Sequence, residues 1–372
     1  SLISQIGLPF LFLTLYPSYM VSPTQGIFKY ETTIWFKLFT SSLILWGICD
    51  VLKRHGGFAN LGRGTWSLSP IGVFAILVSM RWGITVPPQI PPDDYHFGEH
   101  LVGWYSYVQG MLPYIDHIPS HGIVANNLDQ LFSSLFYDGT AASLRDASRI
   151  TATLLAMLAY LSILRLTGSL LLSFVAVVLY AGRTDWLILV PLVCLCFDTR
   201  LQKEADRWLI LWATGSILTV LALPPQGVIL VAASSVYVIC MLRQWLKNGI
   251  TRTSRWIAPG VFSLLLILFF TPTGYMLFGA VRYVVENGPI NQIAYGFRWA
   301  SSIWTPPQSG FWLEALRMMW VIAPIACIAI MYRTFGVEIS KRNKVCAAVM
   351  VMAFTLLITP YSMGRIDGGS IS

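Results

Sequence analysis

Two long runs of residues without a charged side chain constrain this chain more than any other feature. Trp256 to Ala280 is one run, and Trp208 to Leu242 is the other, divided by Pro224-Pro225-Gln226. Each half of the second run approaches the roughly 17–25 residues that cross a bilayer as a helix. Only 11% of the residues are charged, against about 25% in soluble domains. Because a helix satisfies its own backbone hydrogen bonds in lipid, we expect a helical membrane protein.

The apolar segments predict an all-α fold, a polytopic transmembrane helical bundle of about 11 membrane helices that forms a single domain, 1–372. Residues 1–21 have no basic region or cleavage site of a signal peptide, so we interpret them as the first membrane helix. The expected spans are 1–21, 32–52, 67–87, 147–164, 167–181, 186–197, 208–223, 227–242, 257–279, 317–332 and 345–361.

The distribution of charge predicts the orientation of these helices. If the N-terminus is cytoplasmic, most of the 25 basic residues fall in cytoplasmic loops, as the positive-inside rule requires. This asymmetry explains the net charge of +8 without nucleic acid as a partner. Two loops then lie outside, 88–140, with short amphipathic helices, and 280–314. Between Arg81 and Arg145 the chain has no Lys or Arg at all.

The six cysteines all fall in apolar segments, at positions 49, 194, 196, 240, 327 and 346. We interpret them as small core residues rather than as disulfides or metal ligands. The spacing of Cys194 and Cys196 differs from that of a CxxC site.

The outer segment 91–129 concentrates acids and four of the five histidines, and three interpretations of it stay open. In the first, Asp93, Asp94 or Glu99 is a general base, and aromatic residues such as Trp104 and Tyr107 stack on a sugar ring. In the second, the segment binds a divalent metal, and in the third it is a solvated loop whose acids and imidazoles pair with one another.

The metal hypothesis rests on an H-x-x-E-H pattern made by His96, Glu99 and His100. Two histidines four residues apart share one face of a helix and can bind the same ion. Further ligands would come from the same segment, namely Asp116, His117 or His121.

Four short stretches occur in an order that resembles GT-C-type membrane glycosyltransferases, such as the protein O-mannosyltransferases and the lipid A aminoarabinose transferases of bacteria. These stretches are DDYHFGE at 93–99, PYIDHIPSHG at 113–122, LFYDGTAASLRDASR at 135–149 and YSMGRID at 361–367. The resemblance covers about 91–181 and the tail.

The resemblance implies transfer of a sugar from a polyprenyl-phosphate donor to an acceptor outside the cytoplasm, with inversion, in the bacterial cytoplasmic (inner) membrane. It implies that Asp94 or Asp93 is the base, supported by Glu99. Arginine suits the phosphate of the donor because its guanidinium group matches phosphate geometry. The residues expected to bind the donor are His96, Trp104, Tyr107, Arg145, Arg149, Arg365 and Asp367.

Other functions remain open. Arg145 and Arg149 lie four residues apart and would equally suit snorkelling to the membrane interface beside Asp146. The chain could be a non-enzymatic or catalytically dead subunit that acts as a scaffold in a larger membrane protein complex. A transporter is the third alternative, although Lys37 is one of few charges expected inside a span.

Overall fold

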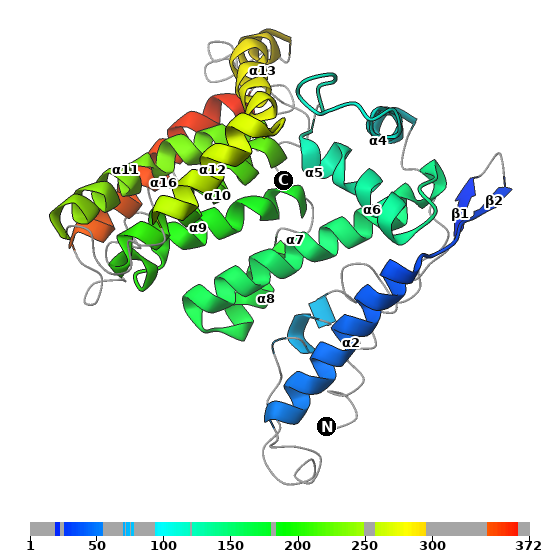
Figure 1. Cartoon of the computed structure of the whole chain (residues 1–372), viewed down its shortest axis with the longest axis horizontal. Coiled ribbons are helices and arrows are strands. Elements are labelled where there is room, and N and C mark those ends of the chain that lie inside the picture. Colours follow the sequence, from blue (N-terminus) through cyan, green and yellow to red (C-terminus); the bar gives the residue numbers. More distant parts are fainter. Residues whose placement is uncertain are drawn as a thin grey trace, which may run out of the picture. The chain divides into compact units, whose positions relative to one another are not determined.

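The computed structural model describes residues 19–22, 26–54, 70, 72–74, 76–77, 94–119, 121–179, 184–248, 257–294 and 341–363, and these are mostly helical (Figure 1). The described chain divides into two compact units, Ser1–Pro191 and Leu192–Ser372. The expected all-α class is confirmed, apart from one small β-hairpin.

The hairpin lies near the start of the first unit. Strands β1 (Tyr19–Ser22) and β2 (Gly26–Lys29) pair antiparallel, with Tyr19 opposite Lys29. Residues 19–21 are therefore extended and do not end a first membrane helix. The rest of the expected span 1–21 lies outside the described residues.

Helix α2 (Ile34–Arg54) follows and is fastened to the end of helix α6 (Leu128–Phe136). The backbone N–H of Thr33 donates to the carbonyl oxygen of Phe136 at 2.8 Å, and the Thr33 hydroxyl donates to that of Leu135 at 2.6 Å. Phe36 is fully buried, and its ring centroid lies 5.4 Å from that of Tyr137. These contacts hold together elements about 100 residues apart in the sequence.

Short helices occupy the segment expected to form the first outer loop. They are α4 (Asp94–Val108), α5 (Ile123–Asn126) and α6, and the 3₁₀ turn η3 (Ala141–Ser143) follows directly after the loop. Helix α4 packs against α5 and α6, and α6 packs along helix α7 (Leu144–Thr167). Short helices were expected in this loop, and the structure contains them.

A glycine explains where the next helix ends, and a pair of prolines explains where a later helix begins. Helix α7 ends at Gly168, whose φ of 68° is readily adopted by glycine. The chain then turns back into α8 (Leu170–Leu179), which lies beside α7 in Figure 1.

After η4 (Thr184–Leu189) and α9 (Val190–Phe197), the second unit has η5 (Leu201–Lys203), α10 (Ala205–Ala222) and α11 (Pro224–Asn248). Two prolines open α11, where the missing N–H groups cost little.

One expected span, 257–279, is wrong as a continuous helix. Helix α12 (Ile257–Phe270) ends before Thr271, and α13 (Thr273–Ala294) leaves at a bend of 75°. The residue before a proline is pushed out of the helical region, so Pro272 explains the break. Helix α13 continues into the segment expected as the second outer loop, 280–314. Helix α16 (Lys341–Met363) completes the described chain.

Two of the described helices are long and apolar enough to cross a membrane, Ala141–Thr167 and Pro224–Lys247, and the bent pair α12–α13 would make a third. Three shorter apolar helices accompany them, at Leu170–Leu179, Asp185–Phe197 and Val345–Leu357. The expected spans 67–87 and 317–332 fall largely or wholly outside the described residues. The larger number of about eleven spans stays a prediction.

Two glycines of α4 allow a matched test of its packing. A Cβ on Gly103 would lie 2.1 Å from the backbone oxygen of Asn126, whereas a Cβ on Gly98 would meet nothing within 4 Å. We expect Gly103→Ala to destabilise the protein by about 1–3 kcal/mol, because neither backbone can give way easily. Gly98→Ala should stabilise it by about 0.5–1 kcal/mol.

Thermal unfolding of the two purified variants in the same detergent measures this difference. Equal melting temperatures for Gly98→Ala and Gly103→Ala would show that α4 does not approach α5 so closely.

Candidate functional site

Helix α4 has two unlike faces, and this difference defines the candidate site. Its inner face presents the buried Gly103 and Ser106 to α5 and α6, with the half-buried Glu99 and His100 one turn earlier. Its outer face is apolar and exposed, and consists of Val102, Tyr105 and Val108. The spacing of three or four residues separates the two faces.

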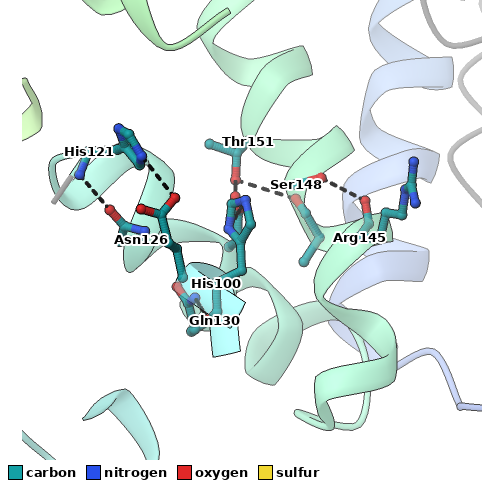
Figure 2. A network of polar contacts seen from close by, with 10 residues as sticks. His100, His121, Asn126, Gln130, Arg145, Ser148 and Thr151 are labelled. Carbon is teal, nitrogen blue, oxygen red and sulfur yellow. Dashed lines mark hydrogen bonds and ion pairs between the residues drawn. The ribbon is translucent and has the colours of Figure 1, made fainter. Parts of the chain in front are cut away.

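Glu99 and His121 form the first polar contact of the inner face. The Nε2 atom of His121 lies 2.9 Å from Oε2 of Glu99, and both side chains keep partial exposure, 32% and 20%. The backbone N–H of His121 donates to Oδ1 of Asn126 at 2.8 Å, as Figure 2 shows. The buried Asn126 side chain therefore positions His121, and His121 positions the carboxylate.

His100 points to a different acid, Asp129 of α6. Its Nδ1 atom lies 3.9 Å from Oδ2 of Asp129, while the Thr151 hydroxyl donates to Oδ1 at 2.6 Å. Nε2 of Gln130 donates to the backbone oxygen of His100 at 3.1 Å (Figure 2). Asp129 is 4% exposed. Burial raises the pKa of its carboxyl to about 7, although the bond from Thr151 acts in the opposite direction.

A third polar contact joins the following loop to the start of α6. Nδ2 of Asn127 lies 3.4 Å from Nε2 of His117, and burial lowers the pKa of His117 against the effects of Asn127 and Asp116. Tyr114 stands at a positive φ of 63° and donates its N–H to the carbonyl oxygen of His117 at 2.7 Å. This turn holds His117 over α6.

The two arginines expected at the start of α7 differ in their surroundings. Arg149 is 6% exposed, and its NH1 donates to Oδ1 of Asp146 at 3.1 Å. The Tyr30 hydroxyl donates to the other carboxylate oxygen. Snorkelling to the interface is therefore wrong for Arg149, which belongs to a buried ion pair. Arg145 is half-buried, and in Figure 2 its side chain extends away from His100.

The remaining expected site residues are described in part. The indole Nε1 of Trp104 donates to the backbone oxygen of Gly139 at 2.9 Å, so Trp104 also ties α4 to the turn before α7. Tyr107 is half-buried on α4. Asp94 and His96 lie in the first two turns of α4, but their side chains are outside the described part. Asp93, Arg365 and Asp367 lie outside the described residues altogether.

The two side chains of the H-x-x-E-H pattern that the structure describes, Glu99 and His100, do not face a common site. Glu99 contacts His121, whereas His100 approaches Asp129. Among the described residues no three His, Cys, Asp or Glu side chains are placed to hold a metal ion together. What the arrangement offers is a pair of carboxyl groups, each with a histidine beside it, one partly exposed and one buried.

Sequence reasoning counted Asp129 among the acids of segment 91–129 but missed the other residues that build this framework, which are Tyr30, Asn126, Asn127, Gln130 and Thr151. One signal was available, the polar run NNLDQ at 126–130, which continues into the first turn of α6. Comparison of the chain with models of protein families, with curated proteins and with solved structures found no match.

The buried Asp129 predicts a specific pH dependence of stability. Its pKa is about 7 in the folded protein and about 3.8 when exposed. A raised carboxyl pKa contributes stability that is fully present below the unfolded value and is lost as the pH rises through the folded value. We therefore expect the wild type to lose stability between about pH 4 and pH 7 through this group, and Asp129→Asn to lose less over that range.

Melting temperatures measured from pH 4 to pH 8 would test this expectation. Asp138→Asn, which changes an exposed acid of loop 88–140, should keep the wild-type profile. If the melting temperature of Asp129→Asn changed with pH in parallel with that of the wild type, the carboxyl of Asp129 would not have a raised pKa.

Proposed function

We propose that this chain is an integral membrane transferase of the GT-C type, which moves a sugar from a polyprenyl-phosphate donor to an acceptor hydroxyl outside the cytoplasm, with inversion. The observation that carries the proposal is the pairing of Glu99 with His121. The partly exposed carboxylate stands on the helix that begins with the acidic stretch 93–99, and a histidine from the second stretch holds it at 2.9 Å.

The chemistry requires a base and a displacement at one carbon atom. A carboxylate accepts the proton of the acceptor hydroxyl, whose oxygen then forms a bond to the anomeric carbon. The bond between that carbon and the phosphate oxygen breaks, and polyprenyl phosphate leaves with the electron pair. Asp94 or Asp93 is the base in this proposal. Glu99, oriented by His121, supports it.

The faces of α4 fit a position at the membrane surface. The exposed residues Val102, Tyr105 and Val108 would meet lipid, and the inner polar face would be sheltered beneath them. A donor whose polyprenyl chain stays in the bilayer would then bring its phosphate to the level of the acids.

Arg145 is the described candidate for the donor phosphate, with Arg365 and Asp367 added by resemblance. Arg149 is a weaker candidate because its guanidinium already pairs with Asp146 in the interior. In this proposal the N-terminus is cytoplasmic, about eleven helices span the bacterial inner membrane, and loop 88–140 faces outward.

A non-enzymatic subunit of a larger membrane complex is the second candidate, and one observation favours it. Three acids at α6 and the helices beside it pair within the chain, Glu99 with His121, Asp129 with Thr151 and Asp146 with Arg149. Pairing of buried acids within the chain is what a purely structural polar core requires.

A transfer assay separates the two candidates. The protein in lipid vesicles is supplied with radiolabelled polyprenyl-phosphate sugars and an extract of acceptors. The combined change Asp93→Asn with Asp94→Asn should lower the transfer rate by roughly 100-fold or more, because it removes the base. Glu99→Gln should lower it less, since Glu99 supports the base.

Asp138→Asn, an exposed acid in the same loop, is the matched control and should transfer at the wild-type rate. Undiminished transfer by the double variant would overturn the mechanism. A wild-type protein inactive with all donors would favour the scaffold.

A further inference from the structure

Two cysteines from distant parts of the chain meet in the second unit. Cys240 lies on α11 and Cys346 on α16, and their Sγ atoms are 3.3 Å apart although 106 positions separate them in the sequence. The two helices pack against each other. Cys346 is 3% exposed, and Cys240 is half-buried.

The packing around the pair holds both thiols on facing surfaces. On α11 the buried Ala233, Tyr237 and Met241 recur every four residues, and Cys240 lies beside this stripe. On α16 the buried Ala347 and Met350 continue the surface that begins at Cys346. Residues at these spacings share one helix face, so the two helices present their cysteines to each other.

The geometry is close to that of a covalent bond. A disulfide has a sulfur–sulfur distance of about 2.0 Å, so the two atoms need to approach by only about 1.3 Å. Rotation about the Cα–Cβ bonds of the two cysteines changes the distance between their sulfur atoms. Cys194 and Cys196 differ in this respect, because two residues apart on α9 they point to nearly opposite sides.

We propose that Cys240 and Cys346 are a redox modification site that closes to a disulfide and links α11 to α16. Two S–H bonds break and one S–S bond forms. The two electrons and two protons pass to a membrane-soluble acceptor of the quinone class, which becomes a hydroquinone. A small membrane-soluble oxidant suits the site, because Cys346 is buried and both thiols lie near the ends of apolar helices.

The cross-link would close a loop of more than 100 residues, which restricts the unfolded chain strongly and stabilises the fold. It would also prevent α11 and α16 from moving apart. The ratio of quinone to hydroquinone in the membrane would thereby set the stability of the second unit. This effect would not depend on any catalytic role of the first unit.

The test oxidises the purified full chain in detergent with diamide, a membrane-permeable two-electron oxidant that converts two thiols to a disulfide. After denaturation, thiols are counted with a maleimide, and linked peptides are identified by mass spectrometry. The wild type should lose two of its six reactive thiols. The peptide containing Cys240 should be linked to the peptide containing Cys346, and dithiothreitol should reverse the link.

Cys240→Ser is the variant of choice because position 240 tolerates a polar group better than the buried position 346. It should retain all five of its remaining thiols under the same treatment, and Cys194→Ser should still form the link. Six reactive thiols in the treated wild type, or a link from Cys240 to any other cysteine, would overturn the proposal. A melting temperature that rises on oxidation in the wild type but not in Cys240→Ser would support it.

Discussion

The buried ion pair between Asp146 and Arg149 is the interaction on which the arrangement of the first unit depends. Two charges removed from water require each other, and Asp146 also requires the hydroxyl of Tyr30. That hydroxyl fastens the segment before α2 to the first turn of α7. The rings of Tyr30 and Tyr137 meet edge to face with centroids 5.6 Å apart. Burial raises the pKa of the Tyr137 phenol, so this ring stays neutral beside the pair.

The position of α4 follows from this anchor through α6. Helix α6 packs along α7, where Thr151 bonds Asp129, and Gln130 then holds the backbone of His100. The close approach at Gly103 leaves α4 little freedom to shift along α5. Glu99 therefore stands on a helix that is fixed from beneath by polar bonds. A catalytic carboxylate needs such preorganisation, but a structural polar core would be built in the same way.

Helices α7 to α11 were predictable as elements because apolar runs mark them, and two of their boundaries have a local cause. A glycine with positive φ ends α7, and two prolines open α11, although the observed ends differ from the expected ones by several residues. The break at Thr271 was missed because the run Trp256 to Ala280 is uncharged throughout. Hydropathy alone does not show where an apolar helix bends. The hairpin at Tyr19–Lys29 was missed for a related reason, since strand pairing depends on two segments at once.

The sequence by itself determined the chemical character of the candidate site: an acidic, histidine-rich segment without basic residues, placed between long apolar helices. Only the tertiary structure decided the partners. Glu99 contacts His121, 22 positions away, and His100 approaches Asp129, while the H-x-x-E-H spacing suggested one shared ion. Local periodicity states which residues share a helix face. The partner across that face depends on how separate helices pack, and so does the approach of Cys240 to Cys346.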